Sequence, residues 1–289
     1  MLIAHDWKEY ELIDTGNGER LERWGEFILR RPDPQVLWPA HNEANVWDNT
    51  DAHYHRSQKG GGRWEFKRLL PPRWTISYKD LIFYIRPTDF KHTGIFPEQA
   101  VNWQWITNKI KSAEPPVKLI NLFAYTGAAT IAAASAGAEI CHVDAAKSMV
   151  GWAKENLTLS GFADHPVRFI TDDVFKFVKR EKRRGRRYDA LIMDPPSYGR
   201  GPDGEVWKLE DALYSLIEQC LDIMSPKPLF FLVNSYTTGF SPTVLENILK
   251  MLVQKKFGGR IKTGEVGLPV TASGLVLPCG IYGRWENEK

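Results

Sequence analysis

Short apolar runs alternate with longer amphipathic segments from residue 98 onward, and this alternation constrains the fold more than any other feature. The runs are predicted to be strands and the amphipathic segments helices. This rhythm is typical of an α/β protein with a doubly wound, mostly parallel sheet. The seven predicted strands are 118–123, 139–144, 167–172, 188–194, 228–235, 260–268 and 274–285. The predicted helices are 98–113, 126–137, 146–161, 173–183, 209–224 and 242–256. Because no helix separates the last two strands, we expect an antiparallel hairpin at one sheet edge.

The chain before residue 90 has a different character. Eight of the eleven tryptophans lie before residue 106, and turn signals such as Gly16-Asn17-Gly18 separate short aromatic runs. Lys79-Asp80, between two apolar runs, is predicted to form the turn of a hairpin. We therefore expect residues 1–90 to be a small β-rich module, a candidate for substrate recognition. Residues 91–289 would form the main α/β domain.

Composition excludes several classes of protein. Apolar residues make up 43% and charged residues 25% of the chain, which is ordinary for a globular protein. The net charge of +3 does not indicate a strongly basic nucleic-acid coat. Cys141, Cys220 and Cys279 are far apart, which offers no disulfide framework and favours a reducing, cytoplasmic setting. Neither a signal peptide nor an apolar run of ~18 residues, the length that spans a membrane, is evident.

Two predicted strand ends carry features of a ligand site, because ligands of such sheets bind beyond the carboxyl ends of the strands. Asn121–Gly127 is a turn into a helix N-terminus with small residues, although a single glycine supports a dinucleotide cradle poorly. A plain strand-to-helix turn is the alternative. Asp144 ends the next strand and suits hydrogen bonds to ribose hydroxyls. It could instead cap the helix that follows.

The third and fourth strand ends add acceptors. Asp172 and Asp173 could accept from an exocyclic amine such as adenine N6, or could both cap the following helix. The sharpest signal is Asp194–Gly199, which reads Asp-Pro-Pro-Ser-Tyr-Gly. Its two prolines predict a rigid extended turn, where the carboxylate and the Pro195 carbonyl would face a planar amine or ring nitrogen. Tyr198 would supply a stacking face.

These four motifs, in this order, resemble the class I S-adenosylmethionine-dependent methyltransferases. Residues 143–161 are similar to a narrower group, the bacterial large-subunit ribosomal RNA methyltransferases that make 5-methylcytosine or 7-methylguanine. Residues 91–99 are similar to the segment that, in that group, closes over the cofactor. The resemblance covers roughly residues 85–289. It implies a Rossmann-like fold, S-adenosyl-L-methionine as the cofactor and RNA as the substrate.

The resemblance also implies roles for individual residues. The cofactor-binding set, carried over from the family motifs, is Phe96, Gln99, Phe123, Tyr125, Thr126, Gly127, Asp144, Asp172 and Asp173. Within it, residues 125–127 would line the methionine part, Asp144 would hold the ribose and Asp173 would face adenine N6, with Asp172 its neighbouring candidate. The acceptor-base pocket, and so the catalytic set, is Asp194, Pro195, Pro196 and Tyr198.

The chain departs from the group in its cysteines. Cytosine C5 is a poor nucleophile, so C5 methyltransferases use a cysteine thiolate to attack C6 first. In the family this cysteine follows the double proline or ends the fifth strand, where the chain has Ser197-Tyr198-Gly199 and Asn234-Ser235-Tyr236. The three cysteines are predicted to be buried structural thiols. A C5 mechanism is therefore disfavoured, and a base nitrogen, exocyclic or in the ring, is the preferred acceptor.

The substrate stays open between several classes. Residues 179–187 read KREKRRGRR, either a solvated helix end or a phosphate-contacting patch. The tract 56–73 interleaves arginines with Trp64 and could form an RNA face, although packing is the simpler role for most tryptophans. A protein or small-molecule methyltransferase and a non-catalytic cofactor- or RNA-binding protein are the alternatives. The histidines lack metal-ligand spacing with cysteines, so no metal is expected, and the oligomeric state is left open.

Overall fold

The computed structural model describes residues 1–57, 61–200 and 206–288. The chain divides into two compact units. The first comprises residues 1–101 and 266–279, and the second comprises residues 102–265 and 280–289. The division expected from the sequence, 1–90 and 91–289, placed segments 91–101 and 266–279 with the second part. Among the described helices, none combines the length and the apolarity needed to cross a membrane.

The first unit is built on a five-stranded sheet in the order β2-β3-β4-β5-β6. Its pairs are antiparallel except for the parallel pair β4–β5. The strands are β2 (Tyr10–Gly16), β3 (Glu19–Trp24), β4 (Phe27–Pro32), β5 (Ala52–Arg56) and β6 (Gly62–Phe66), with α1 (Ala44–Asp48) before β5. Asn17 and Gly18, at φ 53° and 81°, form the two-residue turn between β2 and β3 that the sequence indicated. The β-rich N-terminal module is thus confirmed.

A separate hairpin joins β7 (Trp74–Tyr78) to β8 (Leu81–Ile85), with Tyr78 opposite Leu81. Lys79 at φ 53° makes the turn, as predicted. The unit also holds β1 (Leu2–Ile3), which pairs in parallel with Val266 and Gly267. The pattern of the sequence did not predict β1, because a two-residue strand is too short to show a period.

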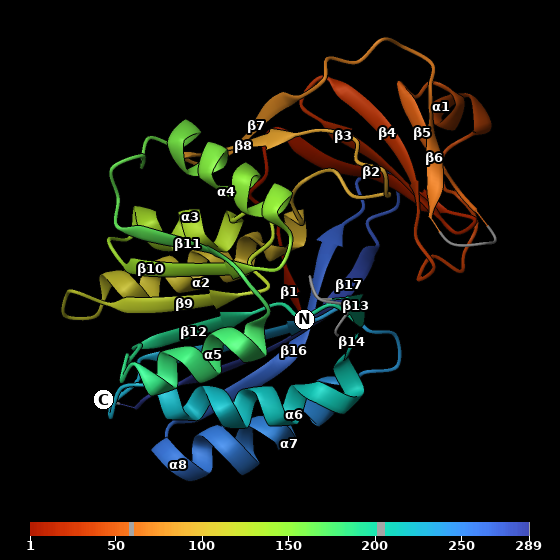
Figure 1. Ribbon diagram of the computed structural model, residues 1–289. Coiled ribbons are helices and arrows are strands. Elements are labelled where there is room, and N and C mark those ends of the chain that lie inside the picture. Colours follow the sequence, from red (N-terminus) through yellow and green to blue (C-terminus); the bar gives the residue numbers. More distant parts are fainter. Residues whose placement is uncertain (58–60, 201–205, 289) are drawn as a thin grey trace. The chain divides into compact units, whose positions relative to one another are not determined.

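The doubly wound sheet has the strand order β16-β17-β15-β12-β9-β10-β11, and its strands β9 to β12 and β15 lie in the second unit (Figure 1). The seven strands are β9 (Lys118–Leu122), β10 (Glu139–Asp144), β11 (Val167–Thr171), β12 (Ala190–Met193), β15 (Phe230–Ser235), β16 (Arg260–Pro269) and β17 (Val276–Glu286). The five strands from β15 to β11 run parallel, and β17 pairs antiparallel with β15. All seven predicted strands are present, and the last two, β16 and β17, are neighbours in the sheet.

Helices lie on both faces of this sheet (Figure 1). They are α2 (Ala100–Lys111), α3 (Ala128–Ser135), α4 (Lys147–Leu159), α5 (Val174–Arg183), α6 (Leu209–Cys220), η2 (Leu221–Ile223), α7 (Pro242–Leu249), the π-helical turn η3 (Lys250–Gln254) and α8 (Lys255–Phe257). The short helix η1 (Pro97–Gln99) belongs to the first unit. The predicted helix 242–256 is therefore interrupted by a π turn. Two short strands that the sequence did not predict, β13 (Tyr198–Arg200) and β14 (Val206–Lys208), follow β12 in the chain and precede α6. They pair with each other antiparallel.

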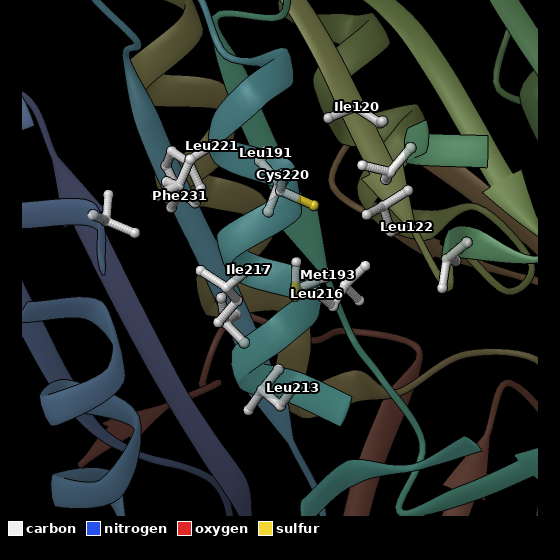
Figure 2. Packing of buried hydrophobic residues seen from close by; sticks show 14 of the residues in the cluster. Ile120, Leu122, Leu191, Met193, Leu213, Leu216, Ile217, Cys220, Leu221 and Phe231 are labelled. Carbon is white, nitrogen blue, oxygen red and sulfur yellow. The ribbon is translucent and has the colours of Figure 1, made fainter. Parts of the chain in front are cut away.

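The core explains why the central strands are continuously apolar. Side chains at alternate positions of β9, β12 and β15 pack against α6 on one face, as Figure 2 shows for Ile120, Leu191 and Phe231. Intervening residues such as Leu119 and Phe230 are also fully buried, on the side opposite α6. A strand covered on both faces must be apolar throughout. On β15 the two polar residues, Asn234 and Ser235, are the last of the strand.

Candidate functional site

The site lies at the carboxyl ends of the parallel strands, next to the point where the strand order reverses. The chain proceeds from β9 outward through β10 to β11, and then returns to the other side of β9 with β12 and β15. The connections on either side of β9 therefore diverge, and open α/β sheets bind ligands at such a switch point. The predicted motifs Asn121–Gly127, Asp144, Asp172-Asp173 and Asp194–Gly199 all follow strands at this edge.

The turn after β9 has an unusual backbone. Phe123, Tyr125 and Gly127 have positive φ angles of 53°, 51° and 85°. Left-handed conformations are costly for the two aromatic residues and cluster at functional sites. At Gly127 a Cβ atom would lie 2.9 Å from Cβ of Ala153, so the position also has no room for a side chain. The sequence pattern indicated a glycine turn, and the strain at Phe123 and Tyr125 is visible only in the structure.

Three hydrogen bonds hold this turn in place. The Ala124 N–H donates to the Val143 carbonyl at 3.0 Å, and the Tyr125 N–H donates to Oδ2 of Asp144 at 2.8 Å. The side chain of Asn156, fully buried in α4, donates to the Thr126 carbonyl at 3.0 Å. Sequence reasoning gave Asn156 no role, although it lies within the stretch 143–161 that resembles the family, because its bond to Thr126 is a tertiary contact.

Asp144 has the acceptor capacity that a diol requires. Its Oδ2 accepts from Tyr125, and its Oδ1 accepts from the Ala146 N–H at 2.9 Å. Each carboxylate oxygen can accept a second hydrogen bond, so both can still receive a hydroxyl. Burial raises the pKa of Asp144, and the two backbone hydrogen bonds offset part of that effect. Ala146 occupies the N-cap position of α4, so Asp144 does not cap that helix.

The two aspartates after β11 have distinct contacts. Asp173 is the N-cap of α5, and its Oδ1 accepts from the Lys176 N–H at 3.0 Å. Oδ1 of Asp172 accepts from the Asp173 N–H at 2.9 Å, and its Oδ2 lies 2.6 Å from the Arg180 guanidinium. The helix-capping alternative is therefore realised for Asp173, while its role toward adenine stays a prediction.

The double-proline turn is fixed from two sides. The Trp207 indole N–H donates to the Pro196 carbonyl at 2.6 Å, and the Ser197 hydroxyl lies 2.7 Å from that of Thr237. Asp194 is half-buried, Pro195 is buried, and Tyr198, in β13, is 53% exposed. This arrangement leaves the tyrosine ring open to a planar partner, in keeping with the predicted stacking role.

Trp207 is the main site residue that sequence reasoning missed. It is 9% exposed, and its ring lies 4.8 Å from that of Phe123 and 6.0 Å from that of Phe175. It therefore ties the turn after β9 to the start of α5 and to the double-proline turn. Its strand β14 is only three residues long and carries no motif, so no pattern could reveal this contact.

The cysteines lie away from the strand ends. Cys141 is buried inside β10, Cys220 is buried in α6, and Cys279 is half-buried within β17. Burial raises the pKa of the Cys141 thiol to about 11 and also raises those of Cys220 and Cys279. A thiol with a raised pKa is a poor source of the thiolate that a C5 mechanism needs.

Phe96 and Gln99 belong to the first unit. Phe96 precedes η1 and faces the His92 ring at 5.5 Å, and Gln99 is buried at the end of η1. Their expected place over the cofactor stays a prediction from the resemblance.

The basic tract 179–187 is largely paired within its surroundings. Arg180 pairs with Asp172, Lys182 pairs with Asp222, and Arg184 and Arg186 lie within 4.0 Å of the fully buried Glu181. These contacts support the interpretation of the tract as a solvated helix end more than as a free phosphate-binding patch.

Comparison with known proteins adds to this geometry. A family profile described as S-adenosylmethionine-dependent methyltransferase matches residues 39–220. A crystal structure of a SAM-dependent methyltransferase from Agrobacterium tumefaciens is 40% identical, with a TM-score of 0.94 over 99% of this chain and 93% of that one. A putative SAM-dependent methyltransferase from Streptococcus mutans, 19% identical with a TM-score of 0.72 over 97% and 76% of the two chains, shares the fold.

Curated relatives match a shorter part. Ribosomal RNA large subunit methyltransferase K of Neisseria meningitidis is 29% identical over 142 residues, 49% of this chain and 39% of the relative. Ribosomal RNA large subunit methyltransferase K/L of Hahella chejuensis is 29% identical over 178 residues, 59% of this chain and 23% of the relative. The chain thus spans less than two fifths of the length of these relatives.

Proposed function

The chain belongs to the S-adenosylmethionine-dependent methyltransferase family, and from that premise we propose that it methylates a base nitrogen in RNA, in the first place ribosomal RNA. It is a methyltransferase enzyme, and S-adenosyl-L-methionine is its cofactor. The choice of a nitrogen acceptor rests on the rigid turn Asp194–Tyr198 after β12. Among the described residues, no cysteine lies at this end of the sheet.

The residues at the carboxyl ends of β9 to β11 fit this cofactor. When bound, the cofactor supplies an electrophilic methyl group on its sulfonium. We assign the ribose hydroxyls to Asp144, whose two oxygens retain acceptor capacity. The turn of Phe123, Tyr125, Thr126 and Gly127 would hold the methionine part, because its strained backbone is fixed before the ligand arrives. Asp172 and Asp173 are the candidates for the adenine amine.

The double-proline turn would receive the acceptor base. The carboxylate of Asp194 and the carbonyl of Pro195 can accept hydrogen bonds from an amine or a ring N–H, and Pro196 keeps the turn extended. The exposed ring of Tyr198 would stack on the base. A nitrogen acceptor held in this way would need no covalent enzyme intermediate, so positioning by these residues would supply most of the rate.

The choice of RNA rests on the relatives and on the first unit. The curated relatives are named ribosomal RNA methyltransferases. On β6, Phe66 is 54% exposed and its ring stacks 6.3 Å from that of Trp64, and Lys67 follows Phe66 in the chain, a pairing suited to a base and a phosphate. An enzyme that acts on ribosomal RNA would work in the cytoplasm of a bacterium, so the proposal includes that location.

Two other functions use the same fold. The enzyme could act on a protein or a small molecule, or the chain could bind cofactor or RNA without catalysis. A single assay separates these: the protein is incubated with labelled cofactor and ribosomal subunits from a strain that lacks the gene. We expect label in the RNA fraction. Label only in ribosomal protein would contradict the proposal, and cofactor binding without transfer to any fraction would favour the non-catalytic alternative.

A further inference from the structure

We propose that His53, His55 and Glu65 of the first unit form a binding site for one divalent transition-metal ion, of which zinc is the best suited. This site would be separate from the residues assigned to methyl transfer, and it goes beyond the proposed function. All three residues belong to the hairpin of β5 and β6.

Strand geometry places the three side chains on one surface. His53 and His55 are two positions apart on β5, so they point to the same face of the sheet. Tyr54, between them, is 3% exposed and packs inward against Trp64. Glu65 lies directly opposite His53 in the register of β5 and β6. The outer face of this hairpin therefore carries two imidazoles and a carboxylate side by side.

The distances suit a common ion. One ligand atom from each residue lies within 4.8 Å of the other two, and the two imidazole ring centroids are 4.0 Å apart. Zinc takes imidazole nitrogen and carboxylate oxygen at about 2.1 Å, so ligands of a tetrahedral ion are separated by about 3.4 Å. Small side-chain rotations would bring the three atoms to that spacing.

The neighbouring contacts orient the ligands. Nε2 of His55 lies 2.7 Å from Oε2 of Glu65, so these two groups already converge. Nε2 of His53 lies 2.6 Å from Oε1 of Glu19, which is itself paired with Arg30. Glu19 could therefore serve as a fourth ligand or remain the carboxylate that positions His53. Neutral imidazole and carboxylate are the donors that zinc accepts.

The sequence alone could not predict this metal site. A search for metal ligands looks first for cysteine and histidine at short spacing, and His53-Tyr-His55 alone is not specific. Only the pairing of β5 with β6 brings Glu65 into the group. The expectation that no metal is bound, stated from the sequence, is the one that this proposal revises.

The test is a titration of the full chain, free of any polyhistidine tag and stripped of metal, with Zn²⁺ and with Co²⁺. We expect one ion per chain by calorimetry and a Co²⁺ absorption spectrum without thiolate charge-transfer bands. His55→Ala and Glu65→Gln should each weaken binding at least tenfold, as loss of a ligand does. His41→Ala, an exposed histidine of the same unit, should leave the affinity unchanged.

Measurements of folding and of thermal stability provide independent controls. Glu65 is exposed and glutamine keeps its shape, so circular dichroism should show Glu65→Gln folded. Zn²⁺ should raise the melting temperature of the wild type more than that of Glu65→Gln. Absence of stoichiometric binding, or equal affinity in the wild type and both ligand variants, would overturn the site. Neither result bears on methyl transfer, which is measured separately.

Discussion

At the scale of single residues, hydrogen bonds set the roles of the carboxylates at the strand ends. Asp144 keeps acceptor capacity on both oxygens, whereas Asp173 uses Oδ1 to cap α5. The sequence placed both at strand ends, since an acid after an apolar run is easy to see. Which acid caps a helix and which faces a ligand depends on backbone angles, so it could not be predicted.

Asp144→Ala should weaken the binding of S-adenosyl-L-methionine at least tenfold, because two hydroxyl acceptors are lost in a half-buried position. Isothermal titration calorimetry measures this directly. Asp164→Ala, which removes an exposed aspartate of the same unit, is the matched control. Equal affinity in the two variants would remove Asp144 from the cofactor site.

The affinity for the cofactor should also depend on pH. Burial raises the pKa of Asp144 above the usual 3.8, and only the ionised carboxylate accepts from two hydroxyls. Affinity should therefore rise as pH increases through that raised pKa and then level off. The raised pKa also means that the protonated carboxyl stabilises the fold at low pH, and that this contribution is lost as pH rises through the folded-state pKa. Titrations across the acid range would contradict the assignment if affinity fell instead.

Asp194→Ala should retain cofactor binding and lose methyl transfer by at least a hundredfold, because it removes an acceptor for the base and leaves the cofactor residues intact. Calorimetry with the cofactor and a transfer assay on the same preparation separate the two effects. If the variant lost cofactor affinity instead, Asp194 would be a cofactor-binding residue, which contradicts its proposed role toward the acceptor base.

At the scale of elements, the turn after β9 was predicted from the sequence, has a strained backbone and belongs to the proposed cofactor site. Long periodic strands and helices were predictable because burial on both faces imposes apolar runs. Strands β1, β13 and β14, of two or three residues each, were not, because they have no period to detect. The contacts of Trp207 and Asn156 are tertiary and leave no local signal.

Gly127→Ala tests the turn. A side chain there would be held at φ 85° and would press on Ala153 at 2.9 Å. We expect a loss of unfolding free energy of about 1–3 kcal/mol and weaker cofactor binding. Urea denaturation followed by calorimetry measures both. The substitution Gly137→Ala, also at positive φ but in open space, should cost stability without affecting the cofactor. Equal cofactor affinities in both variants would mean that the turn does not contact the ligand.

At the scale of the whole molecule, each unit has its own sheet and its own proposed role. The second unit holds the residues assigned to the cofactor and the base except Phe96 and Gln99, which belong to the first. The first unit also carries the exposed Phe66 of β6. The tryptophans crowded before residue 106 indicated a separate module, but not that segment 266–279 joins it. Contacts across such a distance in sequence have no pattern to reveal them.

Replacing Cys141, Cys220 and Cys279 by alanine should leave methyl transfer within tenfold of the wild type, since all three thiols lie away from the strand ends. A steady-state assay of the triple variant, with circular dichroism as the folding control, decides this. A folded variant without activity would restore the covalent C5 mechanism.

The central claim is that the enzyme methylates a nitrogen of an RNA base. The most direct measurement is transfer from labelled S-adenosyl-L-methionine to ribosomal RNA of a strain lacking the gene, followed by digestion and mass analysis of the nucleosides. We expect a base methylated on nitrogen, and no such product in the same reaction with Asp194→Ala. Labelled 5-methylcytidine, or an RNA that accepts no methyl group, would contradict it.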